Sequence, residues 1–292
     1  MNRYGVGRQW LWAIASGLFL QGAPLPVPAQ VVTLSDLNST ATVNLGPGAG
    51  NSVGMTRWTL DGIDNLAQQW FWYRVGSAGP EQPINTIGGL TFSQPNPRTL
   101  YATYFNGQYG VTINYLLTGS STPANVFDGF IDSDISESIS ITNATLGPLP
   151  FHFFQYSNFN LAGTPGSQTV TLGKNLRGLF NEADQTLGFG AVIAALSETV
   201  VTPGANRGEV GLFNSTLAKL SDGNTDDLNN DSGPLTGDAT WAFQWDFSIP
   251  AGSSVGITKD KYLELALIPE PSSVLLLSFG LAALVLRKRR LL

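Results

Sequence analysis

The chain has 292 residues, only 12% of which are charged, and it carries a net charge of −6 without a single cysteine. The lack of cysteine excludes disulfide bonds and thiolate metal sites, so burial of apolar surface must stabilise the fold. The acidic balance argues against nucleic acid as a partner, because phosphates are bound by basic surfaces.

The N-terminus has the three parts of an export signal. Two arginines precede the apolar stretch Trp10–Leu20, and small residues lead up to Ala29. We therefore expect signal peptidase to cleave between Ala29 and Gln30, which makes residues 1–29 a signal peptide. A buried helix is the alternative for the apolar stretch, but it explains neither the basic flank nor the cleavage site.

The middle of the chain, residues 30–268, has the pattern of strands separated by turns. Trp70–Tyr73 is apolar on both faces, which favours a central strand. Val111–Leu117 and Trp241–Ile249 alternate apolar and polar residues, the period of a half-buried strand. Further strands are expected around Ile139 and Ile141, over 151–159, and from Val255 onwards.

Turn signals recur throughout this middle region, whereas helical periodicity is scarce. One short helix is indicated by Leu212, Phe213, Leu217 and Leu220. Many short strands with long connections predict an all-β domain over 30–268, an antiparallel β-sandwich or jelly roll. A signal peptide and a C-terminal membrane helix are expected to flank it.

The C-terminus combines a proline-delimited apolar run with a basic end. Pro269, Glu270 and Pro271 precede Ser272–Leu286, which carries no charge. Proline suits the first turn of a helix, and fifteen helical residues span roughly 22 Å, less than the ~30 Å hydrocarbon core. We expect a short, temporary membrane helix whose basic end stays cytoplasmic, so that residues 30–268 lie outside. The basic stop consists of Arg287, Lys288, Arg289 and Arg290.

This ordered tail, residues 269–292, resembles the PEP-CTERM sorting signal. The resemblance implies recognition by exosortase, a membrane-embedded transpeptidase, in a bacterium that makes exopolysaccharide. Three aromatic segments of the middle region are also similar to the body of many PEP-CTERM proteins, which implies a recurring exported β-domain without an assigned activity. These segments are Gln69–Gly76, Phe151–Tyr156 and Trp241–Phe247.

Catalytic motifs are scarce. His152 is the only histidine, it lies between two phenylalanines, and no G-x-S-x-G elbow is present to pair with it. Glu182 and Asp184 begin a spacing found in jelly-roll glycosidases, but Leu187 replaces the third carboxylate. We therefore predict that the protein is not an enzyme. A further acidic group on an expected solvated strand face comprises Asp132, Asp134 and Glu137.

One segment has the spacing of a calcium loop. Asp222, Asn224 and Asp226 occupy positions 1, 3 and 5, where oxygen ligands are preferred. The segment departs from an EF-hand at two positions. Asp227 stands in place of the turn glycine, and Gly233 stands in place of the bidentate glutamate. The alternative is an Asn/Asp-rich turn whose side chains bond the nearby backbone. No cofactor other than calcium is indicated.

Five tryptophans follow the expected cleavage site, and their placement on strands favours a core. If the other face of the same strand were exposed, Phe71 and Tyr73 would offer an aromatic surface for sugars. The leading functional prediction is an exosortase-processed protein of the cell surface or exopolysaccharide matrix, with a structural or adhesive β-domain. A carbohydrate-binding module is the first alternative, and a polysaccharide hydrolase is the second. Extracellular polysaccharide is a candidate partner besides signal peptidase and exosortase.

Overall fold

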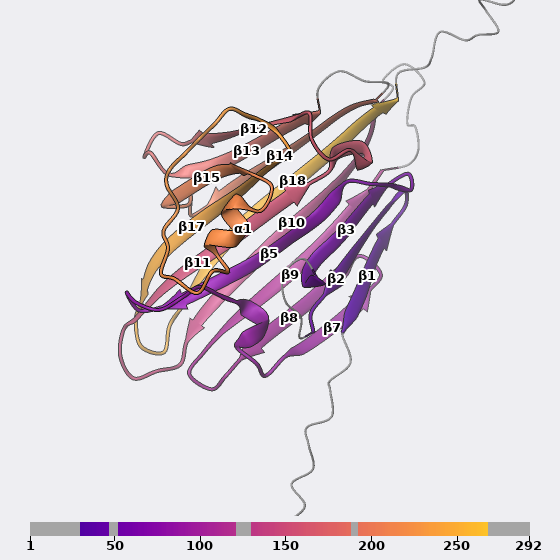
Figure 1. Cartoon of the computed structure of the whole chain (residues 1–292). Coiled ribbons are helices and arrows are strands. Elements are labelled where there is room, and N and C mark those ends of the chain that lie inside the picture. Colours follow the sequence, from indigo (N-terminus) through magenta and orange to yellow (C-terminus); the bar gives the residue numbers. More distant parts are fainter. Residues whose placement is uncertain (1–29, 47–51, 121–129, 188–191, 268–292) are drawn as a thin grey trace, which may run out of the picture.

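The computed structural model describes residues 30–46, 52–120, 130–187 and 192–267. Within these ranges the chain forms two antiparallel sheets that pack face to face (Figure 1). The predicted all-β sandwich is therefore confirmed. Only one short α-helix, α1 (Ser215–Lys219), occurs in the described part, within the segment where the sequence indicates a helix.

Sheet A contains the aromatic strands that the sequence indicates most clearly. Its main path runs β1-β2-β3-β5-β11-β17-β15, with β4 paired to β3 and β6 paired to β5. The bounds are β1 Val31–Asp36, β2 Ser39–Asn44, β3 Gly54–Leu60, β4 Ile63–Asp64, β5 Leu66–Val75, β6 Gln82–Pro83, β11 Leu149–Phe159, β15 Arg207–Leu212 and β17 Ala239–Ile249.

Sheet B is built from longer and more polar strands, in the order β16-β12-β13-β14-β18-β10-β9-β8-β7. The bounds are β7 Thr91–Asn96, β8 Thr99–Phe105, β9 Tyr109–Gly119, β10 Phe130–Asn143, β12 Gln168–Lys174, β13 Phe180–Leu187, β14 Val192–Thr202, β16 Leu235–Gly237 and β18 Ser254–Leu267. Two 3-10 turns complete the described elements: η2 Ile84–Thr86 and η3 Leu161–Gly163.

Aromatic side chains fill much of the space between the sheets. The ring centroids of Phe71 and Phe153 lie 5.3 Å apart in a stacked pair, and Phe159 stacks on Trp241 at 5.4 Å. Trp70–Tyr73 is buried on both faces, which confirms the predicted central strand. The inner face of β5 packs against sheet B, where the Lys259 ammonium lies 5.1 Å from the centre of the Phe71 ring, and the outer face is covered by the segment around Asp226 and Asp227, which Arg74 contacts.

Two lysines and two glutamates are fully buried between the sheets, on the inner face of sheet B. Lys261 pairs with Glu137 at 2.6 Å, and Lys259 lies 3.2 Å from Glu198 and also pairs with Glu137. We refer to these four residues as the ionic network. Burial lowers the pKa of Lys259 to about 8. Burial also raises the pKa of Glu198, but the two ammonium groups and a hydrogen bond from Gln155 outweigh this effect and lower it.

The ionic network corrects one expectation from the sequence. Glu137 does not share a solvated face with Asp132 and Asp134, because successive residues of β10 point to opposite faces of the sheet. Its side chain points into the core with those of Ile135 and Ile139, while the two aspartates point outwards. The predicted acidic group is therefore split between the two faces of the strand.

Candidate functional site

A hollow on the outer face of sheet B brings together an aromatic ring and small polar side chains. The antiparallel register places Tyr101 opposite Asn114, Asn114 opposite Ser138, and Ser138 opposite Thr258, so one row crosses four strands. The hollow has a volume of about 260 Å³. Its lining consists of Thr99, Tyr101, Asn114, Tyr115, Leu116, Ser136, Glu137, Ser138 and Thr258.

A second hollow of about 450 Å³ adjoins the first, and the two share Thr99 and Leu116 in their walls. Arg98 lies beside it, donates a hydrogen bond to the carbonyl of Leu117, and pairs with Asp36 at 3.6 Å. We refer to the two hollows together as the sheet B groove. The second is lined by Ser35, Asp36, Asn96, Pro97, Arg98, Thr99 and Leu116.

The sheet B groove combines two kinds of contact. Tyr101 is 43% exposed and Leu116 is 39% exposed, so apolar surface is available for a flat ligand. Hydroxyl and amide groups beside them can both donate and accept hydrogen bonds. Such a mixture suits a ligand that has apolar faces and hydroxylated edges.

Two carboxyl groups lie next to the groove on the same face. Ser136, which lines the groove, donates a hydrogen bond to Asp260 at 2.7 Å. Burial, followed by the neighbouring Asp260 carboxyl, raises the pKa of Asp134 to about 7. Asp134 therefore holds its proton up to near neutral pH, whereas an ordinary aspartate loses it near pH 4.

Asp134→Asn should change how stability depends on pH. Because the folded-state pKa is raised, Asp134 contributes stability that is present below about pH 4 and is lost as the pH rises through about 7. The variant lacks this loss, so its Tm relative to the native chain should be higher at pH 8 than at pH 5. Thermal unfolding at both pH values measures the difference. An equal Tm difference at both pH values would show that burial and the Asp260 carboxyl do not raise the pKa of Asp134.

The tryptophans are core residues, as the sequence predicts. Trp58, Trp70, Trp72, Trp241 and Trp245 are all buried. Phe71 and Tyr73 are buried as well and offer no aromatic surface for sugars, because that face of β5 packs against sheet B. The exposed aromatic rings on the described strands of sheet B are instead Phe92, Tyr101, Phe105 and Tyr262. The signal in the sequence was the alternation along β8, where Leu100, Ala102 and Tyr104 point inwards.

A second group of polar side chains lies on the outer face of sheet A. His152 on β11 and Asp246 on β17 are direct cross-strand partners, and His152 Nδ1 lies 2.6 Å from Asp246 Oδ1. Gln244 Nε2 donates to Asp246 at 2.8 Å and to Asp227 at 2.7 Å. Arg207 lies 3.3 Å from Asp227. We refer to His152, Asp227 and Asp246, together with Gln244 and Arg207, as the His152 cluster.

Asp227 is held in this cluster from the sheet side. Arg74 Nη2 donates to its carboxylate at 3.0 Å, and the buried guanidinium also pairs with Glu81. Burial raises the pKa of Asp227, but hydrogen bonds from Gln244 and Arg74 outweigh it and lower the pKa. Hydrogen bonds from His152 and Gln244 likewise overcome burial and lower the pKa of Asp246. Both carboxylates are therefore ionised at neutral pH.

The segment with calcium-loop spacing lies over the outer face of sheet A. Asp222 accepts hydrogen bonds from the backbone and the side chain of Asn224, as in an Asn/Asp-rich turn. The backbone of Asp226 donates to Glu81 and accepts from Arg74. Calcium binding by Asp222, Asn224 and Asp226 is not tested by these contacts and stays a prediction. The sequence did not indicate that Asp227 would join the only histidine.

The glycosidase-like spacing lies on the exposed outer face of sheet B, on β13 between β12 and β14. Glu182 and Asp184 point outwards from β13, and the intervening Ala183 is buried. Their cross-strand partners are Thr199 and Ser197, neither of which is a carboxylate. Leu187, at the position of the missing acid, is half-buried at the end of the strand. The structure therefore supplies no third carboxylate from these neighbouring positions.

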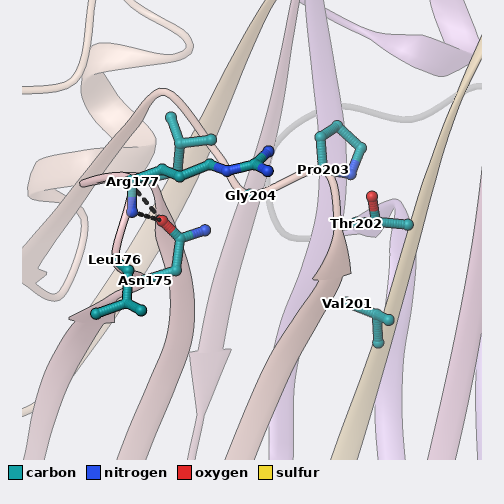
Figure 2. Close-up of a pocket in the computed structure, with 8 residues that line it drawn as sticks. Asn175, Leu176, Arg177, Val201, Thr202, Pro203 and Gly204 are labelled. Atoms are coloured by element: carbon teal, nitrogen blue, oxygen red, sulfur yellow. Dashed lines mark hydrogen bonds between the residues drawn. The ribbon is translucent and has the colours of Figure 1, made fainter.

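A hollow of about 340 Å³ lies between two loops at one end of the sandwich (Figure 2). Asn175 accepts hydrogen bonds from the backbone of Arg177 and Leu179, which fixes the first loop as a tight turn. Figure 2 shows the Arg177 side chain extending towards Pro203 on the second loop. This hollow has no acidic lining residue. Its lining is Asn175, Leu176, Arg177, Leu179, Val201, Thr202, Pro203 and Gly204.

The predicted terminal signals lie outside the described residues. These are Ala29 of the cleavage site, the motif Pro269, Glu270 and Pro271, and the basic stop at 287–290, whereas Gln30 is the first described residue. The predicted C-terminal membrane helix falls in the same undescribed part. Among the described residues, no helix combines the length and the apolar character needed to cross a membrane.

Solved structures with a similar backbone come from proteins of carbohydrate chemistry. A bacterial glucoamylase complexed with acarbose has a TM-score of 0.49 at 10% identity, over 83% of this chain and 34% of its own. A putative aldose 1-epimerase from Escherichia coli K12 has a TM-score of 0.49 at 11% identity, over 82% of this chain and 99% of its own. A galactose mutarotase-like protein from Lactobacillus casei ATCC 334 has a TM-score of 0.45 at 9% identity, over 80% of this chain and all of its own.

This comparison corrects the prediction that the protein is not an enzyme. The similar backbones belong to a glucoamylase, a putative epimerase and a mutarotase-like protein. At such low identity the likeness concerns the fold alone and assigns no catalytic residue. The chain spans about a third of the length of the glucoamylase.

The sorting signal is matched directly. No curated protein matches the sequence. The family model of the PEP-CTERM protein-sorting motif matches residues 267–290, which include the predicted Pro-Glu-Pro, apolar and basic parts. This motif implies processing by exosortase and export to the cell envelope. The chain therefore carries a PEP-CTERM protein-sorting motif at residues 267–290.

Proposed function

We propose that this exported protein acts at the cell surface or in the exopolysaccharide matrix, where its sandwich binds polysaccharide in the sheet B groove. The observation that carries the proposal is the row of Tyr101, Asn114, Ser138 and Thr258 across four neighbouring strands. The sorting motif supports the location, since it directs a protein to the envelope. The exposed Tyr101 ring and the polar side chains that line the groove support carbohydrate as the ligand.

The shape of the groove favours a chain over a single sugar. Neighbouring strands lie about 4.8 Å apart, so a row across four strands spans roughly 14 Å. The second hollow adjoins the first at the neighbouring cross-strand pair Thr99 and Leu116 and extends towards Arg98. A polysaccharide lying across the strands would place one sugar face on Tyr101 and its hydroxyl groups against Asn114 and Ser138.

The groove also suits a ligand that must be held without deep burial. Its lining side chains lie on strands fixed by sheet hydrogen bonds, so they lose little freedom on binding. Ser136 is further fixed by its hydrogen bond to Asp260. Binding to many repeats along one polysaccharide would then give retention on a matrix even where each site binds weakly.

Tyr101→Ala should weaken polysaccharide binding by about tenfold, which is ~1.4 kcal/mol, because it removes the exposed ring of the groove. Affinity electrophoresis through gels that contain soluble neutral or acidic polysaccharides measures the retardation. Phe105→Ala is the matched control, because Phe105 is 40% exposed on the same strand and the same face but does not line the groove. Its retardation should equal that of the native chain.

Two results would count against the proposal. Equal losses for the two variants would show that the ring at Tyr101 has no special part in binding. If no polysaccharide retarded the native chain, including the exopolysaccharide of the producing bacterium, the groove would not be a carbohydrate-binding site. Circular dichroism should show unchanged β-structure in both variants, since both side chains are partly solvated.

A further inference from the structure

The His152 cluster places three metal-ligating side chains within reach of one another. His152, Asp227 and Asp246 each offer one ligand atom, and these atoms all lie within 4.8 Å of one another. They come from β11, from the segment between α1 and β16, and from β17. We propose that these three residues form a binding site for a divalent transition-metal ion of the Zn²⁺ type.

The donor set selects the kind of ion. One imidazole nitrogen with two carboxylate oxygens suits Zn²⁺ and its neighbours, whereas calcium and magnesium prefer oxygen alone. Three protein ligands leave a fourth position for water or for a ligand atom. This site differs from the predicted calcium loop, because its two carboxylates come from Asp227 and Asp246 and not from Asp222 or Asp226.

Neighbouring side chains hold the two carboxylates in place before an ion arrives. Gln244 donates to both of them from the same amide nitrogen. Arg74 fixes Asp227 from the buried side, and its own charge is balanced by the buried Glu81. The backbone of Asp246 donates to the Asn206 side chain at 2.8 Å. Hydrogen bonds of this kind orient metal ligands and are part of a metal site.

The charge of the cluster also fits a dication. Glu81 offsets Arg74, so Asp227 and Asp246 face a single remaining cation, the guanidinium of Arg207. That side chain is 38% exposed, and its only direct ion pair among the described residues is with Asp227. It can therefore turn towards solvent when an ion takes its place. His152, Asp227 and Asp246 are all partly exposed, so an ion can reach them from solvent.

Zinc titration of the purified full-length chain, prepared without a polyhistidine tag, tests the proposal. Isothermal calorimetry should show one Zn²⁺ per chain, and Zn²⁺ at a hundredfold excess over its Kd should raise the Tm by roughly 5–10 °C. Because His152 is the only histidine, the ring protons of a single imidazole should shift in the proton NMR spectrum. His152→Ala, Asp227→Asn and Asp246→Asn should each weaken binding at least tenfold.

Asp222→Asn is the matched control, because it changes an acidic residue of the same segment that lies outside the cluster. Its affinity for Zn²⁺ should equal that of the native chain. Equal affinity of native protein and His152→Ala would overturn the proposal, since surface carboxylates would then account for binding. Imidazole signals that stay unchanged in native protein under excess Zn²⁺ would also overturn it, and this result does not depend on how any variant folds.

Discussion

Lys259→Met is expected to lower the free energy of unfolding by about 3–5 kcal/mol, because it breaks a buried ionic network and leaves a carboxylate without its partner. Lys259 contacts both Glu137 and Glu198 at zero exposure, and its ammonium lies 5.1 Å from the centre of the Phe71 ring. Methionine keeps most of the volume of the lysine side chain, so the loss of stability measures the missing charge and not a cavity. Urea unfolding followed by tryptophan fluorescence measures the shift in midpoint.

The double variant Glu198→Gln/Lys259→Met should recover part of this loss, because it restores the charge balance that the single change removes. The coupling energy between the two sites should lie at roughly 1–3 kcal/mol. Lys174→Met is the control: that lysine is exposed and its ammonium lies 4.3 Å from the centre of the Phe180 ring, so its cost should stay below about 1 kcal/mol. If the Lys259→Met protein were as stable as the Lys174→Met protein, the four charged groups of the ionic network would not be buried away from water.

The buried charges show what alternation along a strand does and does not reveal. Lys259 and Lys261 share the parity of Ile257 and Leu263 on β18, so the sequence places them on the apolar face. A single lysine on the apolar face of a strand usually indicates an edge strand or a strand end, because burial of one unpaired charge is costly. Burial is possible here because Glu137 and Glu198 lie on the two strands that flank β18. That neighbourhood depends on pairing between distant parts of the chain.

Long-range pairing also explains why the candidate sites were only partly predictable. Period-2 patterns located β9, β11 and β17, and two apolar faces placed β5 in the middle of a sheet. However, 94 positions separate His152 from Asp246, and only the register of β11 on β17 makes them neighbours. The groove row from Tyr101 to Thr258 likewise depends on three registers at once. Local sequence fixes which face a residue occupies, but not which residues it meets there.

Trp245→Ala is expected to cost about 3–5 kcal/mol, as for other aromatic truncations in a packed core. Trp245 is fully buried, its ring centroid lies 6.0 Å from those of Phe153 and Phe243, and its Nε1 donates to the carbonyl of Pro203 at 2.9 Å. Truncation therefore opens a cavity and also removes the indole partner of that carbonyl. Chemical denaturation with calorimetric Tm as a second probe measures the effect.

Two further substitutions separate the packing of Trp245 from its hydrogen bond. Trp245→Phe keeps most of the ring volume and loses only the bond to Pro203, so it should cost about 1–3 kcal/mol. Phe213→Ala removes an aromatic side chain that is 44% exposed, and it should cost less than about 1 kcal/mol. Because Trp245 packs against the ring of Phe153, which in turn stacks on Phe71, its loss should loosen contacts as far as the centre of β5. Near-ultraviolet circular dichroism should then lose intensity in Trp245→Ala and keep it in Phe213→Ala, whereas equal spectra would show that the aromatic contacts do not form one packed unit.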